Sequence, residues 1–314
     1  MSFMAPRKPA LARDRRIPAI GIVGAPSAIG IRPYASGAAR HLDRAPEVLR
    51  EFGLVDHLRA ADLGDVASPT YRDYLRPPGR GRNEPEIVAY STALGERVAA
   101  AIASEGFALV LGGDCSIVLG SLLGARQARG RVGLAYVDAH ADFATPGESS
   151  TGSVAGMSLA LAVGRGESPL AHLRGCFPLV DGGHAALLGR RDGEDSRCGR
   201  ADLLASSILD VPDGSLLAEG PEEAARLALR RLTVPELQGF WVHLDADVLN
   251  PLQMPAVDSP VPAGPTLESL VALLKPLVRH PKALGLDLAI YDPRLDPDRA
   301  CATRLVRLLE SLLA

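Results

Sequence analysis

The chain has 314 residues, of which 47% are hydrophobic, and this is ample for a large core in one or two domains. Its formal net charge of −3 gives no long-range attraction for nucleic acid, and no run of about 20 apolar residues predicts a membrane helix. The four cysteines form no CxxC pair, which favours a reducing cytoplasm. Residues 1–16 are basic and lack the apolar core of a signal peptide, so we expect a disordered tail.

Predicted strands and helices alternate along the rest of the chain. Strand patterns occupy residues 17–23, 107–111, 133–137, 239–244 and 283–288, with a further strand end within 187–192. Helical patterns occupy residues 46–52, 84–104, 117–128, 157–163, 221–232, 266–275 and 296–313. This alternation predicts an α/β fold with a mostly parallel sheet and helices on both faces. Because no linker is visible, we expect residues 17–314 to form one domain.

Polar clusters follow three of these strands, at residues 112–116, 138–142 and 245–247. In an extended stretch, Asp138, His140 and Asp142 would point to the same side because they are two residues apart. Buried like charges repel one another unless a cation lies between them. Since the carboxyl ends of parallel strands meet at one edge, the clusters predict a metal site there. So many carboxylates favour two ions, roughly 3.5–4 Å apart, and oxygen and imidazole ligands suit Mn²⁺.

Each of these residues also has a plain structural interpretation. An aspartate at a strand end is commonly a turn former or a helix cap, and Asp114 on its own fits that role. His243 lies two residues before Asp245 and could face the same side, but we expect it to have a structural role under the site. The remaining cysteines share no metal-like spacing, so a structural role is expected for Cys176, Cys198 and Cys301.

The three motifs together resemble those of the ureohydrolase superfamily of arginase, agmatinase and formiminoglutamase. The match keeps the family's order and approximate spacing and covers nearly the whole chain. The resemblance implies a three-layer αβα sandwich, a dinuclear manganese centre and a homo-oligomer, either trimer or hexamer. It also implies that a metal-bridging hydroxide attacks the trigonal carbon of a small guanidinium or amidine substrate, releasing urea or formamide and an amine. The metal ligands implied in this way are Asp138, His140, Asp142, Asp245 and Asp247.

Further site residues follow from the same resemblance. Asp142 would also pass the proton to the leaving nitrogen, which makes it the expected catalytic residue. Thr151 and Ser153, by motif position, and Asp192, in the segment 188–192, are candidate substrate contacts. Each of these three could instead be a solvated loop residue or a turn cap.

The chain departs from the family pattern at several positions. Cys115 stands where a histidine ligand is usual; it could be a thiolate ligand that shifts preference toward Zn²⁺, a residue that binds no metal, or a nucleophile with His140 as its base. Ala155 replaces a histidine assigned to proton shuttling, and Ile290 replaces a glutamate that grips the guanidinium. Asn250 replaces an aspartate that often follows the third motif.

These departures from the family pattern lead to a hypothesis about the substrate. We expect a metal-dependent hydrolase of linear amidine or guanidine C–N bonds whose substrate is less basic than plain arginine, such as a hydroxyguanidine or a formimino compound. Two alternatives stay open. The first is a catalytically silent relative that keeps the fold and binds metal, and the second is a zinc-dependent amide hydrolase.

Overall fold

Parallel strands form one sheet through the centre of the computed structural model, which describes residues 18–73, 75–192 and 199–314. The tail predicted over residues 1–16 lies outside these ranges. In the described part of the chain the sheet order is β2-β1-β3-β8-β7-β4-β5-β6, with every registered neighbour parallel. The strands are β1 Ile20–Gly24, β2 Ala61–Asp65, β3 Phe107–Leu111, β4 Val132–Val137, β5 Ala185–Leu188, β6 Leu209–Val211, β7 Gly239–Asp245 and β8 Ala283–Ala289.

The central strands are buried over their whole length. All residues of β3, β4, β7 and β8 are buried, which explains their continuous apolar runs, because helices cover a parallel sheet on both faces. The edge strand β2 is instead partly exposed and carries polar residues. Strands β3, β8, β7 and β4 are consecutive neighbours, so the polar clusters that follow β3, β4 and β7 converge at one edge of the sheet.

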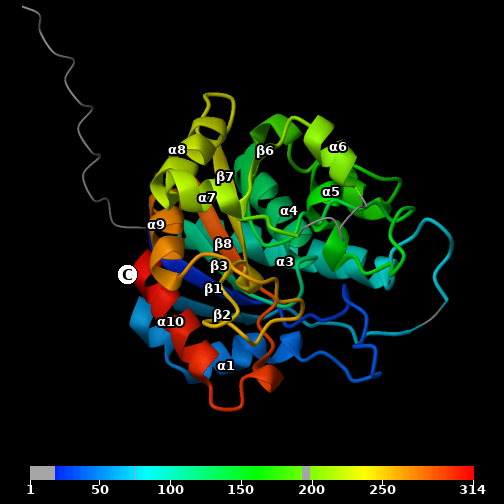
Figure 1. Cartoon of the computed structure of the whole chain (residues 1–314), viewed down its shortest axis with the longest axis horizontal. Helices are drawn as coiled ribbons and strands as arrows, with labels where there is room; N and C mark the ends of the chain where they lie inside the picture. The colour runs from blue at the N-terminus through cyan, green and yellow to red at the C-terminus, as the bar shows by residue number, and fades with distance from the viewer. Residues whose placement is uncertain (1–17, 74, 193–198) are drawn as a thin grey trace, which may run out of the picture.

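Helices cover both faces of the sheet, which confirms the predicted α/β sandwich. Helices α3 and α4 pack on one another on one side, and α8, α9 and α10 pack in series on the other (Figure 1). The helices are α1 Ala45–Glu51, α2 Leu54–Leu58, α3 Glu84–Ser104, α4 Ile117–Arg129, α5 Ser158–Ala162, α6 Arg200–Ala205, α7 Asp213–Glu219, α8 Pro221–Leu232, α9 Leu267–Val278 and α10 Ala300–Leu313. None of the described helices has the length and apolar character needed to cross a membrane.

Glycines bring α3 and α4 into close contact. A Cβ added to Gly124 would lie 2.5 Å from the carbonyl oxygen of Gly95, and one added to Gly120 would lie 2.9 Å from that of Ser91. The two helix backbones therefore touch where only hydrogen atoms fit. Since α4 begins two residues after Cys115, this contact also fixes the start of the helix beside the predicted site.

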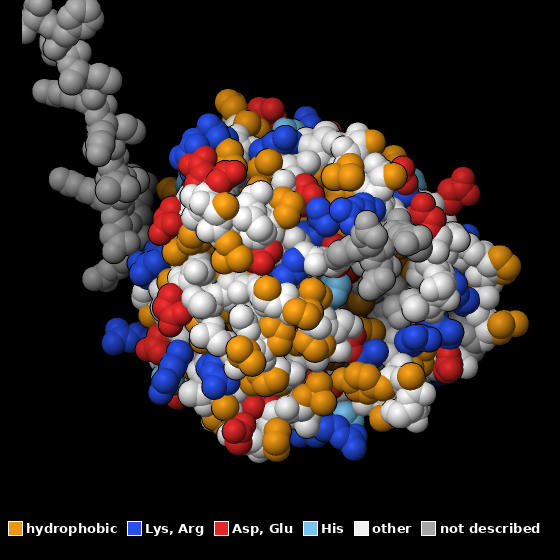
Figure 2. All heavy atoms as spheres, in the orientation of Figure 1, with side chains coloured by type: hydrophobic (Ala, Val, Ile, Leu, Met, Phe, Trp, Pro, Cys, Tyr) orange, Lys and Arg blue, Asp and Glu red, His pale blue; other side chains and the backbone are white. Residues whose placement is uncertain are grey.

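Some boundaries and short elements differ from the prediction. Helix α10 begins at Ala300 rather than at 296, because the Asp296 carboxylate accepts hydrogen bonds from the N–H groups of Cys301 and Ala302. The short elements β2, β6, α2, α6 and α7 were not predicted. On the face shown in Figure 2, acidic and basic side chains are interspersed, in keeping with the small net charge.

Candidate metal centre

Two adjacent glycines hold the loop that follows β3. A Cβ at Gly112 would lie 1.6 Å from the carbonyl oxygen of Leu288 in β8, and one at Gly113 would lie 2.2 Å from that of Ser27. Both approaches are to rigid backbone, so any larger residue would push the loop away. The glycine pair thus places Cys115 at the carboxyl edge of the sheet.

Asp114 ties this loop together. Its side chain is buried, and its two carboxylate oxygens accept hydrogen bonds from the N–H groups of Gly30, at 2.9 Å, and Ser116, at 3.0 Å. These bonds occupy Asp114 within the loop, in agreement with the structural interpretation of an aspartate at a strand end.

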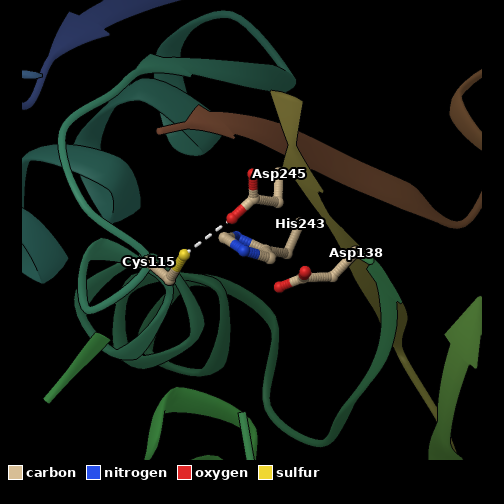
Figure 3. A group of neighbouring side chains, drawn as sticks. All are labelled: Cys115, Asp138, His243 and Asp245. Carbon is tan, nitrogen blue, oxygen red and sulfur yellow. Dashed lines mark hydrogen bonds between the residues drawn. The ribbon is translucent and has the colours of Figure 1, made fainter. Parts of the chain in front are cut away.

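A first group of possible ligands comes from three segments of the chain. Cys115, Asp138, His243 and Asp245 are all buried, and one ligand atom from each lies within 4.8 Å of the others. Figure 3 shows the four side chains pointing toward a common centre from the β3–α4 loop, the end of β4 and strand β7. The Cys115 thiol donates a hydrogen bond to Asp245 Oδ2 at 2.9 Å.

A second group adjoins the first. Asp138, His140 and Asp247 offer ligand atoms within the same 4.8 Å limit. His140 Nδ1 lies 2.9 Å from Asp247 Oδ2 and 3.6 Å from Asp138 Oδ1. Because Asp138 belongs to both groups, two ions could share its carboxylate, as the sequence pattern predicts.

Burial of several carboxyl groups at one place shifts their pKa values. Burial, helped by the charge of Asp247, raises the pKa of Asp138 to about 7, and it raises that of Asp245 well above its usual value. Burial opposes a charge on His140, but Asp247 and Asp138 outweigh it and raise the pKa of this imidazole to about 12. In turn, the His140 cation outweighs burial at Asp247 and lowers its pKa. Without a bound cation, the cluster therefore holds protons.

Two buried atoms in the cluster have no hydrogen-bond partner among the described residues. These atoms are Asp138 Oδ2 and His243 Nε2, and both residues are fully buried. A buried polar atom without a partner costs about 1–3 kcal/mol, so native structures rarely keep one without a reason. Both atoms carry lone pairs, and both belong to the first ligand group. The residues present therefore fit a divalent cation.

Asp142, predicted both as ligand and as catalytic residue, lies beside these groups rather than within them. Its Oδ2 accepts a hydrogen bond from the Tyr136 hydroxyl at 2.6 Å, and its backbone φ is +45°, in the left-handed region. Burial, and the charge of Asp138, raise its pKa well above the usual value. Its role as a metal ligand stays a prediction.

A pocket of about 430 Å³ opens onto the cluster. Cys115, His140, Asp142, Asp245 and Asp247 line it, so the structure brings these predicted site residues to one cavity. Five further positions singled out in the sequence are also among its lining residues: Thr151, Ser153, Ala155, Asp192 and Ile290. Asn250 is not among them.

The three predicted substrate contacts also hold the loops around the pocket. Ser153 Oγ accepts a hydrogen bond from the N–H of Arg32, and Thr151 Oγ1 accepts one from that of Ser153, both at 3.2 Å. Asp192 accepts one from the N–H of Ala141 at 3.0 Å, which ties it to the motif at residues 138–142. These bonds give each residue a structural role, and its contact with substrate stays a prediction.

His243 is the residue for which the sequence interpretation was incomplete. It was expected under the site, whereas the structure places it among the four side chains of the first ligand group. The signal was present in the sequence, because residues 243 and 245 must share one face of a strand.

Fold and site together define an α/β protein with a carboxylate-rich metal-ligand cluster at the carboxyl edge of a parallel sheet. The chain belongs to the arginase family, whose family model matches residues 18–314. It is 28% identical to the arginase of Staphylococcus aureus (strain COL) over 298 residues, which cover 93% of this chain and 95% of that one. It is 27% identical to the arginase of Bacillus subtilis (strain 168) over 305 residues, covering 94% and 97% of the two chains.

Solved structures agree with this assignment. The arginase from Bacillus caldovelox superposes with a TM-score of 0.84 at 26% identity, covering 95% of this chain and 99% of that one. The formimidoylglutamase from Bacillus subtilis superposes with a TM-score of 0.72 at 18% identity, covering 95% and 87%. The second likeness is one of fold alone.

Proposed function

We propose that the protein is a metal-dependent hydrolase of C–N bonds in linear amidines or guanidines, and that its preferred substrate is less basic than plain arginine. The pocket carries this proposal, because the two ligand groups open into the same cavity as Ala155 and Ile290. The family, with arginases among the curated relatives, supports the class of reaction.

Divalent ions held by Asp138 and its neighbours would supply a water of lowered pKa as the nucleophile. We propose two ions: the resemblance implies Mn²⁺, and Cys115 makes Zn²⁺ possible in the ligand group to which it belongs. Burial, and then the charge of Asp138, raise the pKa of Asp142 well above its usual value, which favours the protonated form of its carboxyl group. It can deliver this proton to the leaving nitrogen, and the hydrogen bond from Tyr136 orients its carboxyl group.

The charges around the pocket favour a substrate that is not a strong cation. Besides the ligand groups and Asp142, the carboxylates among the described lining residues are Asp192 and Asp258. Arg190 pairs with the first of these and Arg40 with the second. Outside the ligand groups and Asp142, each carboxylate among the described lining residues is therefore already paired with an arginine. A guanidinium bound here would keep its charge unpaired, and an unpaired charge in a buried site is costly. Ile290 offers only an apolar surface.

A substrate screen tests this function. Protein stripped with a chelator and reloaded with Mn²⁺ or with Zn²⁺ would be assayed for release of urea, formamide, ammonia and amine. The panel is arginine, agmatine, guanidinobutyrate, formiminoglutamate and hydroxyarginine. We expect formiminoglutamate or hydroxyarginine to have the highest kcat/KM, and Asp142→Asn to lower it about 10²–10⁴-fold.

An exposed aspartate provides the control: Asp43→Asn should leave every rate unchanged. Arginine as the fastest substrate would overturn the proposed specificity. No turnover above the Asp142→Asn background would favour the catalytically silent alternative. Activity restored by Zn²⁺ but not by Mn²⁺ after chelation would favour the zinc-dependent amide hydrolase. A homo-oligomeric state and a cytoplasmic location stay predictions.

A further inference from the structure

His243 is held in one orientation by three neighbours. It lies fully buried on β7, directly beside Asp287 of β8 in the sheet register. Its Nδ1 is hydrogen-bonded to Asp287 Oδ1, and the second oxygen of that carboxylate accepts a hydrogen bond from Trp241 Nε1. The imidazole also stacks on the Tyr136 ring, with 4.3 Å between centroids. The ring therefore has little freedom to rotate.

These contacts also fix which ring nitrogen is available. A carboxylate only accepts hydrogen bonds, so Nδ1 of His243 carries the proton that faces Asp287. In the neutral imidazole, Nε2 then carries the lone pair. A histidine held by a carboxylate in this way is the usual arrangement behind a metal ligand, because the carboxylate sets the tautomer and raises the basicity of the other nitrogen.

The free nitrogen belongs to the site. His243 Nε2 is buried with no hydrogen-bond partner among the described residues, and His243 contributes to the group formed with Cys115, Asp138 and Asp245. Asp138 Oδ2, in the same group, is likewise without a partner. Figure 3 shows the imidazole turned toward the centre that the other three side chains face.

We propose that His243 Nε2 is a metal ligand and that, with Cys115, Asp138 and Asp245, it forms a four-residue site selective for Zn²⁺ over Mn²⁺. One sulfur, one imidazole nitrogen and two carboxylate oxygens are the number and kind of donors that suit tetrahedral zinc. The thiol proton of Cys115 leaves to solvent when the ion binds. The neighbouring group of Asp138, His140 and Asp247 has no sulfur, so the two sites differ in the ions that they prefer.

This inference deepens the proposed function, on whose metal centre it rests, but its test needs no turnover. The full-length His140→Asn variant, stripped and loaded with one equivalent of Zn²⁺, isolates the four-residue site, because it removes the imidazole of the second group. X-ray absorption of this sample should show one sulfur at about 2.3 Å and one imidazole nitrogen at about 2.0–2.1 Å. Adding His243→Asn should remove the imidazole contribution and keep the sulfur.

Affinity gives an independent measurement. His243→Asn should weaken Zn²⁺ binding more than about 100-fold, and Asp287→Asn, which keeps the ring but loses its carboxylate, by about 10–100-fold. Cys115→Ser should abolish the sulfur-to-metal charge-transfer band of the Co²⁺-loaded protein. Cys301→Ser, at a buried cysteine in α10, and His184→Asn should change neither the band nor the affinity.

Every outcome bears on the proposal. A zinc spectrum without sulfur or without imidazole in His140→Asn overturns it, as does wild-type affinity in His243→Asn or a preference of this site for Mn²⁺. If His243→Asn fails to fold by circular dichroism, the His140→Asn spectrum and Asp287→Asn still decide. A zinc spectrum with sulfur and imidazole, together with a negative substrate screen, would support this metal site and contradict the proposed hydrolase function. Turnover without that spectrum would support the hydrolase function and contradict this metal site.

Discussion

Ile290 combines an unusual backbone conformation with a position in the pocket wall. Its φ is +68°, in the left-handed region that β-branched residues rarely adopt, and its N–H donates to the carbonyl oxygen of Gly113 at 2.8 Å. The bond ties the end of β8 to the glycine loop that carries Cys115. Strain of this kind, about 1–3 kcal/mol, persists only where the surrounding structure enforces it.

Restoring a carboxylate at this position should shift substrate preference. Ile290→Glu would place a negative charge in the pocket and replace a β-branched side chain that suits the backbone poorly. A hydrogen bond to a charged group contributes about 1.5–3 kcal/mol, so kcat/KM for arginine relative to hydroxyarginine should rise about 10–100-fold. Steady-state kinetics on both substrates measure this ratio. Ile290→Gln is the matched control without charge, and an equal rise in both variants would contradict the argument.

At the scale of single residues, much of the cluster could be predicted from the sequence. Asp138, His140, Asp245 and Asp247 lie at or just after the ends of buried strands, and parallel strands bring such positions together whatever the details of packing. The shared strand face places His243 on the same side as Asp245, but the orientation of its imidazole ring could not be predicted in the same way. Its Nδ1 is hydrogen-bonded to Asp287 on strand β8, and only that pairing leaves Nε2 facing the ligand group.

At the scale of elements, the α3–α4 contact depends on glycines, which have no side chain to hold the two helices apart. Gly124→Ala would bring a methyl group within 2.5 Å of the Gly95 carbonyl oxygen, where backbone on both sides prevents relief. The overpacking should lower the free energy of unfolding by about 1–3 kcal/mol. The higher helix propensity of alanine offsets about 1 kcal/mol of this loss. Urea unfolding would measure the change. Gly214→Ala in α7, where an added Cβ meets nothing within 4 Å, is the control and should be neutral or stabilising.

The prediction of elements succeeded where local sequence is sufficient. Long apolar strands such as β3 and the long helix α3 have the expected bounds, because burial on every side demands continuous apolar residues and helices demand a 3.6-residue period. The three-residue strand β6 carries no such pattern, since it exists through its pairing with β5. Likewise the start of α10 depends on a hydrogen bond to the side chain of Asp296, and the spacing of apolar residues does not predict such a bond.

At the scale of the whole molecule, the metal centre links stability to pH. A group whose pKa is higher in the folded state than in the unfolded state makes folding less favourable as pH rises between the two values. The pKa of Asp138 rises from its usual 3.8 to about 7, so the metal-free protein should lose stability from about pH 4 to pH 7. His140 acts in the same direction only above its usual pKa of 6.5, and Asp247, whose pKa is lowered, acts only below 3.8.

Metal binding should reverse this trend, since the ion competes with protons for the same carboxylates. Bound ions stabilise the folded state by RT ln(1 + [L]/Kd), and Kd falls as Asp138 loses its proton. The difference in Tm between protein with excess divalent metal and protein with EDTA should therefore widen steadily from pH 4.5 to 7. Differential scanning calorimetry at fixed ionic strength measures it. Asp138→Asn should reduce the dependence, because the amide has no proton to lose, while Asp142 and Asp245, whose pKa values are also raised, keep theirs. A constant difference in the wild-type protein would mean that the cluster does not exchange protons for metal.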